Sequence, residues 1–449
     1  MPTRVLIVSH EAPAPHMAGP AIRYWHIAQA LASECQVCLA VPDTPLLAGE
    51  GFQVVGYQRQ GGAPLPALLA QADVVLAMGF LLRRYPFLQE TDRPLVIDLY
   101  DPFILENLEI HRHRPLDEQA SIHAFDLGVL NEQLRRGDFF LCAHESQRDF
   151  WLGMLAANGR VNPYTTAADR TLRRLIDQVP FGLPAEPPQH RRPVLKGVRP
   201  GIAPHDRLIY WGGGLWEWFD PLTAIRAVAE VAEVHPNVRL FFAGVRHPNP
   251  DVPPMRMAEA ARALADEMGL TDRLVFFNDW VPYAERENYL LEADLGISLH
   301  FEHLETRYSF RTRLLDYIWA GLPMVVTGGD TLGQRIAAEG LGAVVAPGDA
   351  AGVRDALLRL LAQPDLREQT ALRFAAMRAA LSWERVVEPL RLFCRAPYRA
   401  ADRVAAPRQE EPRPPLLQRA WRVLRQQGAA ALWSETRAYI RWRMTRPPR

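Results

Sequence analysis

The feature that most constrains the fold is a regular alternation of short apolar runs with segments of helical length, which occurs twice along the chain. In the first series, the apolar runs lie at residues 4–9, 36–41, 74–78, 95–99 and 139–142. Short runs rich in Val, Ile and Leu, separated by segments of helical length, are typical of parallel strands buried on both faces. The first helix between them is expected from Pro20 to Ala32. The first series therefore predicts a doubly wound α/β domain.

A second series of the same kind follows a proline-rich segment at residues 180–204, which predicts an interdomain connector. Strands are expected at residues 208–211, 239–243, 274–277, 295–298, 324–327 and 343–345. Helices are expected at residues 221–234, 255–268, 284–292, 312–319, 351–362 and 365–381. The predicted fold class is α/β, with two doubly wound Rossmann-like domains that face a cleft. We place the first domain at residues 1–183, the second at 184–399, and a linker with a basic amphipathic helix at 400–449.

Composition narrows the class of protein. The 449 residues are 48% hydrophobic and 23% charged, which is ordinary for a globular protein, and the formal net charge is zero. We therefore expect no nucleic-acid partner. No apolar run reaches the length of a membrane span, and the four cysteines fit a reducing compartment, so a cytoplasmic location is expected. Cys35 and Cys38 have C-x-x-C spacing, but on a strand they face opposite sides, and we expect neither a metal nor a redox site there.

The residues most indicative of chemistry lie between Glu305 and Val326. A polar loop is expected to lead into a helix from Thr312 to Trp319, which ends at Gly-Leu-Pro before a buried strand. Unpaired backbone amides at such a helix start, with guanidinium groups nearby, favour a diphosphate. A second glycine-rich segment, Gly212, Gly213 and Gly214, directly follows an expected strand and would let a phosphate approach the backbone closely. The alternative is an ordinary tight turn.

Together, the two alternating domains, the glycine-rich segment and the sequence Leu-Leu-Asp-Tyr-Ile-Trp-Ala-Gly-Leu-Pro-Met-Val at residues 314–325 resemble glycosyltransferases of the GT-B architecture. Within that group the chain is similar to the retaining nucleotide-sugar transferases of family 4, over roughly residues 1–395. The resemblance implies that Asp316 binds the ribose hydroxyls of the donor nucleotide. It also implies that the loop containing Gly19 lies beside the donor phosphates. The residues that it places near the base are Trp280, Val281 and Pro282.

The chain departs from the family pattern at two places. The usual first glutamate is replaced by Tyr308, and Glu305 could serve only if the loop has a different shape. The usual arginine and lysine after the glycine-rich segment are missing, so we expect Arg311 or Arg313 to supply the positive charge, with Ser309 in the same donor-binding loop. Alternatively, these arginines form salt bridges at the helix start with Glu305 or Asp316.

The first domain is expected to present the acceptor side, with Asp98, Tyr100 and Asp101 as candidate catalytic residues at the end of its fourth strand. Asp101 is the favoured residue for orienting the sugar or deprotonating an acceptor hydroxyl. The alternative role is to cap a helix that begins near Pro102. The resemblance implies that cations and helix dipoles stabilise the leaving diphosphate, so no cofactor and no metal are expected.

The resulting prediction is an enzyme that moves a sugar from a nucleotide diphosphate sugar to a hydroxyl of a saccharide or lipid-linked acceptor, in cell-surface glycan or glycolipid synthesis. The resemblance implies retention at the anomeric carbon. The alternatives are a non-catalytic partner subunit of the same fold and a sugar-nucleotide epimerase. The segment 416–449 has eight arginines and one acid, with apolar residues at helical spacing. Such a helix can lie on the inner face of a membrane, or dock on the protein or on a dimer partner.

Overall fold

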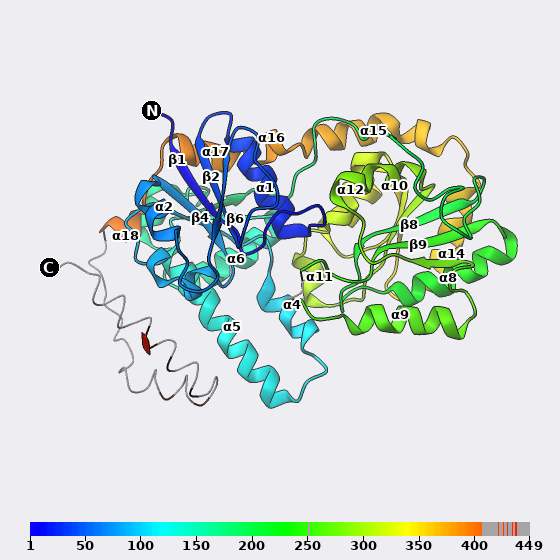
Figure 1. Cartoon of the computed structure of the whole chain (residues 1–449), viewed down its shortest axis with the longest axis horizontal. Coiled ribbons are helices and arrows are strands. Elements are labelled where there is room, and N and C mark those ends of the chain that lie inside the picture. The colour runs from blue at the N-terminus through cyan, green and yellow to red at the C-terminus, as the bar shows by residue number, and fades with distance from the viewer. Residues whose placement is uncertain are drawn as a thin grey trace.

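The computed structural model describes residues 1–249 and 252–405, and six single residues between 421 and 437. Two α/β domains lie side by side (Figure 1). The first contains a seven-stranded parallel sheet in the order β3-β2-β1-β4-β5-β6-β7. Its strands are β1 (Arg4–Val8), β2 (Gln36–Pro42), β3 (Gln53–Tyr57), β4 (Val74–Met78), β5 (Leu95–Asp98), β6 (Phe139–Cys142) and β7 (Ile176–Gln178). The sequence had not indicated the edge strands β3 and β7.

Helices cover both faces of this sheet. They are α1 (Gly19–Leu31), α2 (Leu65–Gln71), α3 (Leu81–Arg84), η1 (Pro86–Leu88), α4 (Phe103–Ile110), α5 (Leu116–Arg136), α6 (Glu145–Ala157) and α7 (Pro163–Ala168). Alternate residues of one strand enter different cores: Val5 and Ile7 lie in one apolar cluster, and Leu6 and Val8 in another. This alternation explains the continuous apolar runs in the sequence, because both sides of each strand are buried.

The second domain repeats the arrangement with six parallel strands in the order β10-β9-β8-β11-β12-β13. The strands are β8 (Arg207–Gly214), β9 (Val238–Gly244), β10 (Val275–Phe277), β11 (Leu295–Ser298), β12 (Met324–Thr327) and β13 (Gly342–Val345). The helices are α8 (Pro221–Val234), α9 (Arg256–Glu267), η2 (Tyr283–Glu285), α10 (Arg286–Glu292), α11 (Leu304–Tyr308), α12 (Thr312–Ala320), α13 (Thr331–Glu339), α14 (Ala350–Leu361) and α15 (Leu366–Ala380). The prediction of two doubly wound domains is confirmed.

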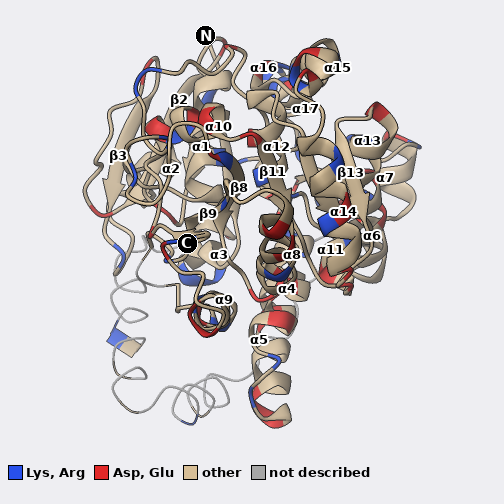
Figure 2. Ribbon diagram, turned by 90° about the vertical axis from the view of Figure 1, so that its right-hand side faces the viewer, with Lys and Arg blue, Asp and Glu red and all other residues tan. Residues whose placement is uncertain are grey.

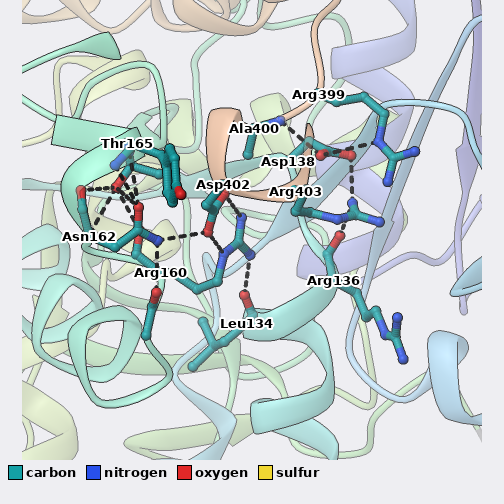
Figure 3. Close-up of polar contacts among 12 residues, drawn as sticks. Leu134, Arg136, Asp138, Arg160, Asn162, Thr165, Arg399, Ala400, Asp402 and Arg403 are labelled. Carbon is teal, nitrogen blue, oxygen red and sulfur yellow. Dashed lines mark hydrogen bonds and ion pairs between the residues drawn. The ribbon is translucent and has the colours of Figure 1, made fainter. Parts of the chain in front are cut away.

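After α15, the chain returns to the first domain through α16 (Trp383–Val386), α17 (Glu388–Arg395) and α18 (Ala401–Ala405), as Figure 1 shows. Two ion-pair groups hold the last helix (Figure 3). Arg160 pairs with Asp402 at 2.6 Å, and Arg403 pairs with Asp138 at 2.7 Å. The backbone N–H of Ala400 also donates to Asp138 at 2.9 Å. The end of the described chain is therefore attached to the first domain.

Acidic and basic residues are interspersed along the ribbon in Figure 2, where α5 projects beyond the body of the molecule. No helix in residues 1–249 and 252–405 is long and apolar enough to cross a bilayer. The helix predicted at 416–449 lies outside the described residues, apart from the six single positions.

Candidate functional site

The helix predicted after the polar loop is present as α12, and its start lies beside the carboxyl end of the second sheet. It ends at Gly321, which has a left-handed φ of 59°. Glycine adopts this conformation without the steric penalty that a side chain would cause. Leu322 and Pro323 then lead directly into the buried strand β12, so the signals of Gly-Leu-Pro in the sequence predicted this corner correctly.

The glycine-rich segment differs from the predicted turn. Strand β8 continues through Gly212, Gly213 and Gly214, with a register irregularity against β9 and a φ of 67° at Gly213. Helix α12 contacts this strand end at two points. The Gly212 N–H donates to the Tyr317 hydroxyl at 2.8 Å, and Arg313 donates from Nη2 to the Gly214 carbonyl at 2.6 Å. The amide of Gly212 is thus occupied by a side chain of the protein.

The two candidate arginines have different surroundings. Arg311 is buried and forms a bidentate ion pair with Glu305, at 2.9 and 2.6 Å. The alternative of a salt bridge at the helix start therefore holds for Arg311, and the proposed diphosphate ligand is already neutralised there. Ser309, also buried, donates its hydroxyl to the Thr306 carbonyl at 3.3 Å.

Arg313 is a buried cation held by aromatic rings. Only 6% of the residue is exposed, and its Cζ lies 3.8 Å from the ring centroid of Phe219 and 5.0 Å from that of Trp211. Within the described residues its Nη1 makes no hydrogen bond. Burial, with Arg311 adding to it, lowers the pKa of Arg313 to about 9. Because a buried cation without a counter-ion is costly, a bound anion near the start of α12 would stabilise this arrangement.

Asp316, the residue expected to bind the ribose, lies beside an arginine that sequence reasoning missed, Arg286. Asp316, with 38% of its side chain exposed, pairs with Arg286 at 3.4 Å. The Arg286 guanidinium lies over the rings of Tyr283 and Trp319, at 3.7 and 4.4 Å. Arg286 immediately follows η2, so its position depends on the loop between β10 and α10 and could not be predicted from a motif.

Loops of the two domains meet where the resemblance had placed the donor. Trp280 donates its indole N–H to the Met17 carbonyl at 3.4 Å, and the Tyr283 N–H donates to the Pro15 carbonyl at 2.8 Å. Val281 is buried and Pro282 is half-buried. Gly19 begins α1 directly after this first-domain loop, and a Cβ built on it would have open space around it. The structure thus brings the glycine loop and the 280–282 loop together.

The three candidates of the first domain separate into different environments. Asp98 is fully buried and forms a bidentate ion pair with Arg23, so both of its carboxylate oxygens are occupied within the first domain. Tyr100 is also buried and donates its hydroxyl to the Phe310 carbonyl of the second domain at 2.9 Å, which is a contact between domains. Asp101 is half-buried.

Asp101 has the electrostatic surroundings of an acid–base group. Burial and the nearby Asp98 carboxylate raise its pKa to about 7, with smaller contributions from Glu11 and Glu305. Burial and Asp101 also raise the pKa of Glu106 well above its usual range. These carboxylates come from both domains, and sequence reasoning missed Glu11 and Glu106 because neither belongs to a local motif.

A pocket of about 500 Å³ is lined by residues of both domains, and none of the carboxylates around Asp101 lines it. Its lining comes from the loop after α4, from the segment after β8 and from α9: Arg112, His113, Glu217, Arg256, Met257, Glu259, Ala260 and Ala263. In the described parts of the chain, no group of three or more His, Cys, Asp or Glu side chains is arranged to hold a metal ion.

Comparisons with known proteins agree with this geometry. Residues 206–363, from β8 through α14, match the family Glycosyl transferases group 1. Sucrose-phosphate synthase from Thermosynechococcus elongatus is 15% identical, with 88% of this chain and 98% of that chain covered and a TM-score of 0.64. The chain has the GT-B fold and resembles the group 1 glycosyl transferases. No curated protein matches it in sequence.

Two further GT-B structures are similar over most of the chain. WaaG, a glycosyltransferase involved in lipopolysaccharide biosynthesis, is 16% identical, with 90% of this chain and 100% of that chain covered and a TM-score of 0.60. HepE of Anabaena, in complex with UDP and glucose, is 13% identical, with 86% and 98% covered and a TM-score of 0.58. At these identities the structures establish the GT-B fold, whereas the family match assigns the second domain to the glycosyl transferase class.

Proposed function

We propose that this protein transfers a sugar from a nucleoside diphosphate sugar to an acceptor hydroxyl, with the donor on the second domain. The observation that carries the proposal is that the family match includes the start of α12. There the buried cation Arg313 donates a hydrogen bond to the last residue of β8. The complex of HepE with UDP and glucose supports a nucleotide-sugar donor for this fold.

The donor would contact the protein at three places. The diphosphate would face the start of α12, where the helix dipole and Arg313 favour negative charge. The Asp316 carboxylate, which is 38% exposed, would accept hydrogen bonds from the ribose hydroxyls. The base would lie against the loop of residues 280–282, covered by the first-domain loop that precedes Gly19. Contacts between these loops would exclude water from the activated sugar.

Asp101 is proposed to orient the acceptor or to take its proton. A carboxyl group with a pKa of about 7 is half ionised at neutral pH, which suits proton transfer better than an ordinary aspartate does. No metal ion is required in this proposal, because the helix start and Arg313 supply the positive charge. Retention at the anomeric carbon follows the family resemblance, and the anomeric configuration of the product, measured by NMR, tests it.

The direct test incubates the protein with a panel of uridine, guanosine and thymidine diphosphate sugars and measures donor hydrolysis and transfer. Asp316→Ala should weaken binding of the accepted nucleotide, measured by calorimetry. The exposed Asp365→Ala, at the start of α15, is the matched control. Unchanged nucleotide binding in Asp316→Ala would show that the donor site lies elsewhere, and conversion of the donor without acceptor would identify an epimerase.

A non-catalytic partner subunit is the second candidate, and two contacts favour it. Glu305 neutralises Arg311, and the Tyr317 hydroxyl occupies the Gly212 amide, so two groups expected at the diphosphate are already satisfied. Tight nucleotide binding with no turnover on any saccharide or lipid-linked acceptor would establish this alternative.

The sequence of the arginine-rich segment supports a further part of the proposal, attachment to anionic membrane near a lipid-linked acceptor in cell-surface glycan synthesis. The segment begins after α18, which is held on the acceptor-side domain by Asp138 and Arg160. Sedimentation with anionic liposomes should recover the full chain but not a chain that ends at residue 405. Equal sedimentation of the two chains would rule out membrane attachment by this segment.

A further inference from the structure

Two cysteines that are far apart in the sequence meet where the returning chain packs on the first domain. Cys35 lies between α1 and β2, and Cys394 lies in α17. The Cys394 side chain lowers the pKa of Cys35, and the Cys35 side chain raises the pKa of Cys394. Cys35 is 7% exposed and Cys394 is fully buried, and both belong to the same apolar cluster.

Contacts of the neighbouring residues hold the backbone at Cys35 close to the backbone at Cys394. Arg395 forms a bidentate ion pair with Glu34, at 2.7 and 2.8 Å, so the residues adjacent to the two cysteines are themselves paired. The Thr3 hydroxyl donates to the Cys394 carbonyl at 2.7 Å, and the Thr3 carbonyl accepts from the Gln36 N–H at 2.9 Å. Thr3 therefore connects the backbone beside Cys35 to the backbone of α17.

The other two cysteines are separated from this pair by the sheet. Cys38 lies in β2, three residues after Cys35, and packs with the apolar cluster on the other face, which also contains Cys142. Burial raises the pKa of Cys38 to about 11. The C-x-x-C spacing thus brings no thiol pair together, and no sequence motif connects Cys35 with Cys394.

We propose that Cys35 and Cys394 are a modification site, oxidised by a hydroperoxide to a disulfide between the first domain and the returning helix α17. The Cys394 side chain lowers the pKa of Cys35, with Arg391 and Arg395 contributing, so Cys35 is the attacking thiolate. It attacks one peroxide oxygen, the O–O bond breaks, and Cys35 becomes a sulfenic acid. The Cys394 sulfur then forms the S–S bond, and its proton leaves with the hydroxyl group as water. The two thiols lose two electrons, and hydrogen peroxide is reduced to two molecules of water.

The disulfide would attach helix α17 covalently to the first domain. Helix α17 follows α15 and α16, which carry the chain from the second domain back to the first, so the bond would close a covalent loop through both domains. A cross-link across so long a loop restricts the unfolded chain strongly and should raise the melting temperature by about 5 °C or more. This inference is independent of sugar transfer.

The test treats the full-length reduced protein with hydrogen peroxide, then alkylates it under denaturing conditions and maps the peptides by mass spectrometry. We expect a dithiothreitol-reversible link between the Cys35 and Cys394 peptides, with Cys38 and Cys142 alkylated. The melting temperature should rise in the oxidised protein and in Cys38→Ser, but not in Cys35→Ser or Cys394→Ser. Full alkylation of all four cysteines after prolonged oxidation, or a link to another cysteine or to a second chain, would overturn the proposal.

Discussion

The Arg23 guanidinium and the Asp98 carboxylate form a bidentate ion pair inside the first domain, at 2.6 and 3.0 Å, with 1% and 0% of their side chains exposed. Arg23 also donates to the Val179 carbonyl at 2.8 Å. The pair thus ties α1 to the end of β5 and to the segment after β7. It places the strand end that carries Asp101 at the site while Asp98 itself stays enclosed.

Removal of one partner should destabilise the fold strongly. Asp98→Ala leaves a buried guanidinium without a counter-ion, and we expect a loss of about 3–5 kcal/mol in the free energy of unfolding. Denaturant titration of the first-domain transition measures it. Asp73→Ala, which breaks the exposed pair with Arg4, is the control and should cost much less. Similar losses in the two variants would contradict a structural role for Asp98.

The end of α12 gives a second prediction, which concerns backbone conformation. Gly321 has a φ of 59°, so Gly321→Ala should cost about 1 kcal/mol or more in stability, because a Cβ is unfavourable in this region. Gly153 in α6 is the matched control. A Cβ there meets no atom within 4 Å, so Gly153→Ala should stabilise the helix by about 0.5–1 kcal/mol. Equal effects, measured by thermal unfolding, would contradict the assigned conformation.

The sequence predicted elements whose signals are local. The amphipathic spacing of α12 and the following Gly-Leu-Pro mark a helix, its end and the next strand within a few residues. The glycine-rich segment was expected to follow the strand, whereas pairing of Gly214 with Gly244 on β9 extends β8 through it and overrides the local preference of glycine. The edge strand β3 was missed, since Gln53–Tyr57 is only partly buried and lacks a continuous apolar run.

The site could be predicted only in part, because tertiary contacts decide which charges are available. The charge pattern indicated both Arg311 and Arg313, but it could not show that Glu305 neutralises the first and that aromatic rings enclose the second. The sequence favoured Asp101 but also indicated Asp98, and only the packing of α1 shows that Arg23 pairs with Asp98.

Arg313 should matter for ligand binding more than for stability. We expect Arg313→Met to weaken binding of the nucleoside diphosphate that the protein accepts by about tenfold or more, because a charge-assisted interaction with the phosphates is lost. The melting temperature should not fall, since the variant also removes a buried cation without a counter-ion. Calorimetry and thermal unfolding measure the two effects. Arg354→Met in α14, at a side chain that is 36% exposed, is the control and should not change nucleotide binding. A loss of stability without loss of binding in Arg313→Met would show that Arg313 is structural and does not serve the ligand.

The pKa of Asp101 predicts how activity and stability depend on pH. If its carboxylate takes the acceptor proton, kcat/KM should rise about tenfold per pH unit below pH 7 and level off above it, because the pKa is raised to about 7.

The contribution of Asp101 to stability changes with pH in the opposite direction. A carboxyl group whose pKa is raised on folding stabilises the native state at low pH, and this contribution is lost as the pH rises from about 4 through 7. Asp101→Asn should therefore lose transfer activity while stability varies less with pH across that window. The conservative variant Asp101→Glu should restore part of the activity if the carboxylate reacts. An unchanged pH profile in Asp101→Asn would show that another group, such as Glu106, titrates in the reaction.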